Sequence, residues 1–141
     1  LATALDCSFH DADDFHPAAN IQKMARGIPL EDADRFPWLG RLNTLLREQQ
    51  AAGCSVVLAC SALKESYRTT LTAGLSEVRW VYLRGLAHEL ADRLQKRANH
   101  FMNPALLASQ LEILEEPSHA LVVPMMLPLH EQVQRIQEAL T

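Results

Sequence analysis

Short, unbroken apolar runs alternate along this chain with segments of helical periodicity. Residues 56–59, 79–83 and 120–123 form three such runs, and residues 7–10 could form a further short strand. Apolar runs without polar alternation are typical of strands covered on both faces, and strands separated by helices pair in parallel. The pattern predicts an α/β fold whose parallel sheet is buried on both faces.

Regularly spaced leucines and other apolar residues predict the helices. We expect helices at 20–26, from Trp38 to the stop at Gly53, at 64–71, at 86–94, from Pro104 to 114 and at 133–140, and LATAL reads as the end of a helix. Pro29 and Pro37 interrupt regular structure, so residues 28–37 are expected to form a loop. No repeat or linker is visible, and we expect a single domain over residues 1–141.

Composition excludes several classes of protein. The chain has 141 residues, is 48% hydrophobic and has a formal net charge of -4, which argues against a protein that coats nucleic acid or binds an anionic membrane. Its apolar runs are too short to span a bilayer. Three cysteines without a C-x-x-C pair, and no secretory leader, predict reduced thiols in a soluble cytoplasmic protein.

Acidic residues follow the first predicted strand. In a turn, Asp11 and Asp13 could reach one site and bind Mg²⁺ through water or deprotonate a substrate hydroxyl. Alternatively, Asp11, Asp13 and Asp14 are only cap and turn residues. His16, next to a proline, is either a loop anchor or a site residue.

Polar and cationic residues follow the strand at 56–59. Ser61, Lys64, Tyr67 and Arg68 come at its carboxyl end, where open parallel sheets bind ligands. Cations at a helix start oppose the helix dipole, so an anionic ligand would explain them, whereas the alternative is a solvated helix face. Arg35 could simply pair with neighbouring acids.

A basic segment, RLQKRANHFM, occupies residues 93–102. Its cations could complement a helix C-terminus or could belong to a mobile lid that brings arginine to a transferred phosphate. The six histidines and three cysteines show no zinc-type spacing.

Three segments together resemble the gluconokinases of the shikimate-kinase-like group. They are HDADDFHPAANIQKMARGIPLEDADRFPWL, VVLACSALKESYR and HFMNPALLASQLEILEEP, in this order. The resemblance implies a three-layer α/β/α P-loop kinase fold, similar to nucleoside monophosphate kinases, with a lid at about residues 93–117. It also implies transfer of the ATP γ-phosphate to the 6-hydroxyl of D-gluconate, dependence on Mg²⁺, and a homodimer.

The resemblance implies roles for individual residues. Asp13 and Arg97 would be catalytic, with Asp13 at the substrate hydroxyl and Arg97 in the lid, and Asp11 would lie near the metal. Gluconate would contact Asp13, His16, Arg35, Ser61, Lys64, Tyr67, Arg68 and His100. Arginine binds a carboxylate with two parallel hydrogen bonds, which favours Arg35 and Arg68 for the gluconate carboxylate.

The chain departs from this family's pattern in three places. The G-x-x-x-x-G-K-[ST] phosphate loop and its strand are absent from the 141 residues, so we expect impaired ATP use. The missing strand would lie between the strand ending at Ala59 and the strand at 79–83, and we expect this position to be filled: the sequence is incomplete, the neighbouring strands close up, or another chain lends a strand. VVPMMLPLHE stands where relatives have acidic residues, and Asn99 replaces a lid glycine. Two alternatives stay open: a non-catalytic sugar-acid-binding or dimerising protein, and a kinase for another polyol acid.

Overall fold

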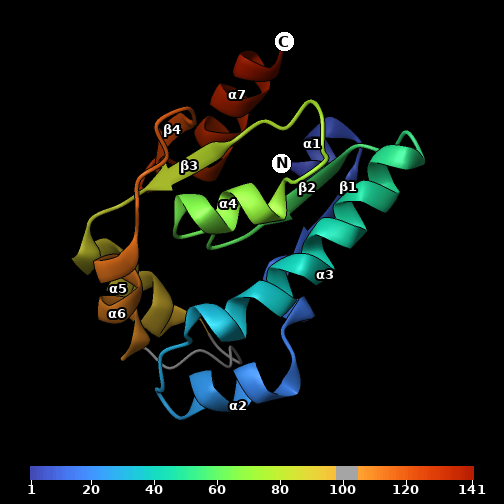
Figure 1. Cartoon of the computed structure of the whole chain (residues 1–141). Coiled ribbons are helices and arrows are strands. Elements are labelled where there is room, and N and C mark those ends of the chain that lie inside the picture. Colours follow the sequence, from blue (N-terminus) through green and yellow to red (C-terminus); the bar gives the residue numbers. More distant parts are fainter. Residues whose placement is uncertain (98–104) are drawn as a thin grey trace.

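A computed structural model describes residues 1–97 and 105–141 as alternating helices and parallel strands. The elements are α1 (Ala2–Leu5), β1 (Ser8–Asp11), the 3₁₀ helix η1 (Ala12–Phe15), α2 (Ala18–Ala25), α3 (Asp32–Ala51), β2 (Val56–Ala59), α4 (Glu65–Leu71), β3 (Val81–Arg84), α5 (Ala87–Lys96), α6 (Leu106–Ile113), β4 (Leu121–Pro124) and α7 (Leu129–Leu140) (Figure 1). The predicted α/β class is confirmed.

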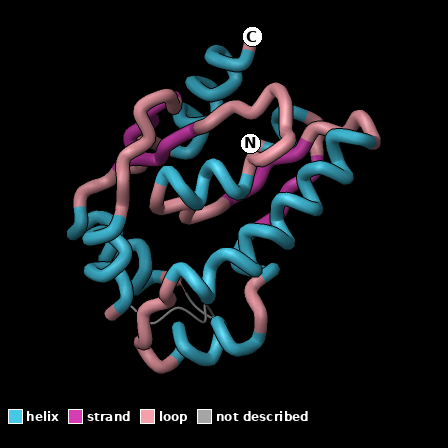
Figure 2. Tube along the Cα trace, in the orientation of Figure 1, coloured by secondary structure: helices cyan, strands magenta, loops and turns pink. Residues whose placement is uncertain are grey.

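The strands form two separate parallel pairs. Strand β1 pairs with β2, with Asp11 opposite Ala59, and β3 pairs with β4, with Leu83 opposite Val123. Figure 2 shows the two pairs as separate magenta stretches of the tube. Within the described residues no strand joins β2 to β3, at the position where the resemblance implies a missing strand, and these two strands do not close up on each other.

The expectation that the strands are covered on both faces is wrong for this structure. Phe9, Leu83 and Val122 are 56%, 49% and 46% exposed, and among the strands of the described residues only Val123 is buried. The physical reason is the division of the sheet, because a pair of strands with a free edge offers less surface for helices to cover than a continuous sheet does.

Helix α3 begins earlier than the sequence predicted. It starts at Asp32 and contains Pro37, which had been expected to end a loop. Proline is tolerated near a helix start because the first N–H groups have no intrahelical acceptor, although position six of the helix is late for this. The Glu31 backbone N–H donates to the Asp34 carboxylate at 2.9 Å, and this contact fixes the first turn.

The main core lies between α3, α4 and the end of β2. Its largest buried side chains include Trp38, Leu42, Tyr67 and Leu71, and Trp38 donates its indole N–H to the Ala12 carbonyl at 2.7 Å. Fully burying one such side chain contributes roughly 1.5 to 3 kcal/mol. This core holds η1, which carries the predicted acidic site, firmly against α3.

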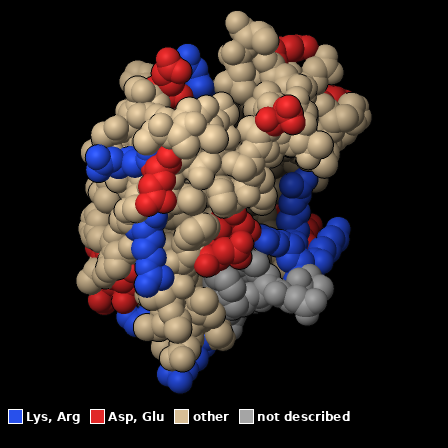
Figure 3. All heavy atoms as spheres, turned by 90° about the vertical axis from the view of Figure 1, so that its right-hand side faces the viewer, with Lys and Arg blue, Asp and Glu red and all other residues tan. Residues whose placement is uncertain are grey.

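The surface carries charges of both signs. On the face shown in Figure 3, basic and acidic groups lie beside each other with uncharged surface between them. Among the described residues, no helix combines the length and the hydropathy that crossing a bilayer requires.

Candidate active site

The carboxyl ends of β1 and β2 bring the predicted site residues together. The pairing of Asp11 with Ala59 places the η1 turn beside the segment that follows β2. A cavity of about 20 Å³ opens there. It is lined by Asp13, His16, Met24, Pro29, Leu30, Arg35, Trp38, Ser61, Leu63, Leu106, Ser109 and Gln110. Four predicted site residues, Asp13, His16, Arg35 and Ser61, therefore share one cavity.

Asp11 shapes the turn that presents Asp13. One carboxylate oxygen of Asp11 accepts the Asp13 backbone N–H at 3.0 Å and caps η1. This is the cap role that the sequence left open for Asp11, and its second carboxylate oxygen is not used in that bond. Asp13 is directed into the cavity, with its Oδ1 atom 3.9 Å from His16 Nε2.

His16 is a buried, neutral ring. It is 8% exposed and stacks on Trp38, with 4.1 Å between the ring centroids and 15° between the planes. Burial, together with the nearby Arg35 guanidinium, lowers the pKa of His16 to about 4. At neutral pH His16 therefore serves as a hydrogen-bonding group and not as a cation.

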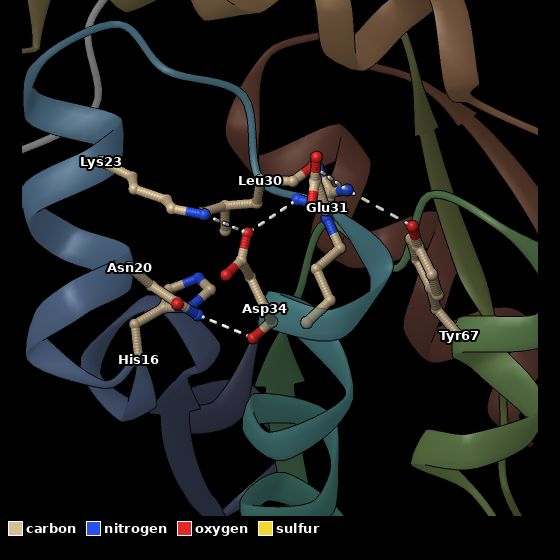
Figure 4. A network of polar contacts seen from close by, with 8 residues as sticks. His16, Asn20, Lys23, Leu30, Glu31, Asp34 and Tyr67 are labelled. Carbon is tan, nitrogen blue, oxygen red and sulfur yellow. Dashed lines mark hydrogen bonds and ion pairs between the residues drawn. The ribbon is translucent and has the colours of Figure 1, made fainter.

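Arg35 belongs to a polar network between α2, α3 and α4, and Figure 4 shows two of its partners, Leu30 and Tyr67. Its guanidinium donates to the Leu30 carbonyl at 2.7 Å and to the Tyr67 hydroxyl at 3.3 Å, and the residue is 7% exposed. Its hydrogen bonds thus go to neutral acceptors, while its charge contributes to the lowered pKa values of Asp32 and Asp34. An anionic ligand in the cavity would compensate this buried charge.

Tyr67 and Lys64 meet a carboxylate of the protein itself. The Tyr67 hydroxyl donates to Asp32, and Lys64 Nζ lies 3.4 Å from the same carboxylate. The hydrogen bond from Tyr67 is the largest cause that lowers the pKa of Asp32, and Lys64 adds to it. Burial, and then the contact with Asp32, raises the pKa of Tyr67. The sequence suggested that an anionic ligand compensates the cation at the start of α4. In the structure, the Asp32 carboxylate lies next to Lys64 instead.

Arg68 is turned away from this network and is 5% exposed. Its Nη1 donates to the Ala62 and Leu63 carbonyls at 2.7 and 3.4 Å, and its Nη2 donates to the Glu115 carbonyl at 2.8 Å. Nε and Nη2 also contact the Glu65 carboxylate at 3.0 and 2.9 Å. Hydrogen bonds from all three guanidinium nitrogens, together with the ion pair, thus hold Arg68 within the protein. Arg68 joins the turn after β2 to the segment after α6.

The remaining lid predictions are only partly described. Arg97 caps the C-terminus of α5, where its backbone N–H donates to the Leu94 carbonyl, and it does not line the cavity. His100 and Asn99 lie outside the described residues.

Sequence reasoning missed three polar residues around the cavity. Ser109 and Gln110 line it from α6, and Asn20 contacts His16 from α2. A signal for the first two was present, because they are adjacent polar residues in the otherwise mostly apolar helix LLASQLEI. Asn20 gave no such signal, because its contact with the Asp34 carbonyl, 14 positions away, depends on the packing of α2 against α3.

Cys60 directly precedes Ser61, and its environment favours the protonated thiol. Burial raises the pKa of its thiol to about 12, and the nearby Asp13 and Asp11 carboxylates contribute to the rise. All three cysteines are free thiols, as the sequence predicted.

A magnesium ion fits this site only as a partner of phosphate. No cluster of three His, Cys, Asp or Glu side chains suited to a metal ion occurs within residues 1–97 and 105–141. Mg²⁺ commonly binds one or two carboxylates and completes its coordination with water and substrate phosphates. Asp11, with one carboxylate oxygen outside the η1 cap, suits that arrangement.

Known proteins resemble this chain over most of its length. It is 50% identical over 117 residues to a gluconokinase of Gluconobacter oxydans, an alignment that covers 83% of this chain and 66% of the relative. It is 44% identical over 133 residues to a probable gluconokinase of Xenopus tropicalis, and this alignment covers 84% of this chain and 70% of the relative. The chain thus spans about two thirds of the length of these relatives. No protein-family model matches it.

Two solved structures share the fold. An unliganded sugar kinase of Janibacter superposes with a TM-score of 0.90 at 39% identity, covering 99% of this chain and 82% of that one. A gluconokinase of Sinorhizobium meliloti superposes with a TM-score of 0.79, also at 39% identity, and the match covers 99% of this chain and 83% of that one.

Proposed function

Because this chain belongs to the gluconokinase family, we propose that it provides the sugar-acid side of an enzyme that phosphorylates D-gluconate on its 6-hydroxyl with ATP. The observation that carries this proposal is the cavity shared by Asp13, His16, Arg35 and Ser61 at the carboxyl ends of β1 and β2. A carboxylate, a neutral donor and a buried guanidinium in one place suit a substrate that is both polyol and anion.

Each residue has a distinct task in this proposal. Asp13 accepts the proton of the attacking hydroxyl, as a positioned carboxylate does in phosphoryl transfer. Arg35 binds the gluconate carboxylate, and Ser61, His16, Lys64 and Tyr67 contact its hydroxyls. Arg68 supports the turn that carries Ser61, because its own donors already have acceptors in the protein.

The cavity has to widen before it can hold gluconate. At about 20 Å³ it has room for roughly one water molecule, whereas sites for small ligands measure about 300 Å³ or more. Leu106, Ser109 and Gln110 of α6 line one side of it. We propose that residues 93–117 act as a lid, and that α6 moves outward to admit gluconate and then closes on it.

The ATP side of the reaction needs groups beyond these. We propose that Arg97 and His100 of the lid approach the transferred phosphate and the substrate, and that Asp11 holds Mg²⁺ through water. The metal would neutralise charge that develops on the phosphoryl oxygens. The proposal also includes a homodimer in the cytoplasm that binds neither nucleic acid nor a membrane, in line with its acidic composition.

A chimera tests the proposal. The amino-terminal segment of the Gluconobacter oxydans gluconokinase is joined before Leu1, and phosphorylated product is measured with MgATP and gluconate, shikimate or other sugar acids. We expect gluconate to be the preferred acceptor, and Asp13→Asn to lower kcat by about 100-fold or more. Equal turnover of shikimate or of another sugar acid would contradict the gluconate assignment.

A further inference from the structure

A buried asparagine links the site histidine to the start of α3. Asn20, in α2, is 3% exposed and lies one helical turn after His16. Its side-chain nitrogen is 2.9 Å from the Asp34 carbonyl oxygen and 3.2 Å from His16 Nδ1 (Figure 4). Sequence reasoning gave Asn20 no role.

The carbonyl of Asp34 decides which way the Asn20 amide faces. A backbone carbonyl only accepts hydrogen bonds, so the amide nitrogen, and not the amide oxygen, has to lie next to it. The same nitrogen carries a second hydrogen, which faces His16 Nδ1. Nδ1 must therefore be an unprotonated acceptor, and the proton of the neutral ring lies on Nε2.

The other nitrogen of His16 faces the predicted catalytic carboxylate. His16 Nε2 is 3.9 Å from Asp13 Oδ1, which is too long for a direct hydrogen bond. An oxygen atom between them, at about 2.8 Å from each, would be within hydrogen-bond distance of both atoms. A hydroxyl at that point can donate its proton to Asp13 and accept the Nε2–H of His16. The stack on Trp38 fixes the plane of the ring.

We propose that Asn20 is a positioning residue that keeps His16 as a neutral Nε2–H donor, so that His16 and Asp13 together bind one substrate hydroxyl. The identity of the substrate rests on the proposed function, whereas the tautomer does not. Among the described residues, the charged groups that contact the ring or shift its pKa are Asp13 from η1 and Arg35 from α3. The lowered pKa of His16 agrees with a neutral ring.

The wild-type protein tests the tautomer directly. Nitrogen-15 and carbon-13 NMR of labelled histidine side chains distinguishes the two neutral tautomers and the imidazolium, and His16→Gln identifies the His16 signals. We expect the Nε2–H form from about pH 6 to 8. An Nδ1–H ring, an exchanging mixture or an ordinary histidine titration would overturn the proposal without any variant having to fold.

Asn20→Asp tests the positioning role. A carboxylate cannot donate to Nδ1, so this nitrogen should become protonated and the pKa of His16 should rise by at least about two units. Lys23→Met is the matched control, because Lys23 lies on the same helix and contacts the Asp34 carboxylate at 2.8 Å without touching His16. The control should leave the tautomer unchanged. An unchanged tautomer in Asn20→Asp would contradict the role of Asn20.

Calorimetric titration with gluconate tests the shared hydroxyl. We expect Asn20→Asp to weaken gluconate binding by about tenfold, and Lys23→Met to leave it unchanged. Unaltered affinity in an Asn20→Asp protein whose tautomer has changed would refute the bridging hydroxyl. If the wild type shows the Nε2–H ring but binds no gluconate, the proposed function fails while the role of Asn20 stands.

Discussion

Replacing Arg68 with methionine separates a structural role from a substrate contact. Methionine keeps the length of the side chain but removes all five donors. The carbonyls of Ala62 and Glu115 then lose their partner, whereas the Leu63 carbonyl keeps the Glu115 backbone N–H at 2.8 Å. The Glu65 carboxylate loses its ion pair. The Glu65 side chain is 69% exposed and water can replace that partner, so the cost comes mainly from the carbonyls.

The expected loss of stability is large for a single substitution. Each buried acceptor that loses its hydrogen bond costs about 1 to 3 kcal/mol, and removing one partner of a buried charged network costs about 3 to 5 kcal/mol in total. We expect the unfolding free energy to fall by about 3 kcal/mol, which for a chain of this size corresponds to roughly 6 to 12 °C in Tm.

Urea unfolding followed by tryptophan fluorescence measures this effect, since Trp38 is buried in the core and Trp80 packs against it. Arg84→Met is the matched control. Arg84 pairs with Glu116 at 3.5 Å, but their side chains are 62% and 54% exposed, so its removal should cost less than about 1 kcal/mol. A wild-type unfolding curve for Arg68→Met, with gluconate binding lost, would refute the structural role and restore Arg68 as a substrate contact.

Two further predictions concern packing and pH. A Cβ on Gly85 would lie 1.9 Å from Sδ of the buried Met125, so Gly85→Ala should destabilise the fold by about 1 to 3 kcal/mol. Gly40→Ala, in α3 with open space around it, should raise the free energy of unfolding by about 0.5 to 1 kcal/mol. Thermal unfolding of both variants measures these changes, and equal shifts in Tm would contradict this reasoning. Because the pKa of His16 is about 4 in the folded chain, below its value of 6.5 when unfolded, the unfolded state binds more protons between these values. Stability should therefore fall by up to about 1.4 kcal/mol per unit as pH drops through this window, and a slope that His16→Gln leaves intact would refute the assignment.

Local patterns predicted much of the fold. The apolar run at 56–59 matches β2 residue for residue, and Gly53 and Gly74 follow their helices with φ of 71° and 75°. The start of α3 was not predictable in the same way, because proline signals a break, whereas here the contact between Glu31 and Asp34 fixes the turn before it. The division of the sheet depends on pairing partners, and strand patterns alone do not contain this information.

The site was predictable where residues follow strand ends. Asp13 and Ser61 meet in the cavity because the carboxyl ends of parallel strands lie together. Contacts across the fold were not predictable from spacing: Asp32 with Tyr67, Asn20 with Asp34, and Arg68 with the Glu115 carbonyl. Each joins residues at least 14 positions apart in the sequence.

Calorimetric titration of D-gluconate into the 141-residue polypeptide, alone and with Arg35→Met, tests the sugar-acid site most directly. We predict measurable binding to the wild type and a loss of about tenfold or more in affinity for Arg35→Met, because the buried guanidinium binds the gluconate carboxylate. Gluconate heat that is absent from a folded wild type, or that is unchanged in Arg35→Met, would contradict the account.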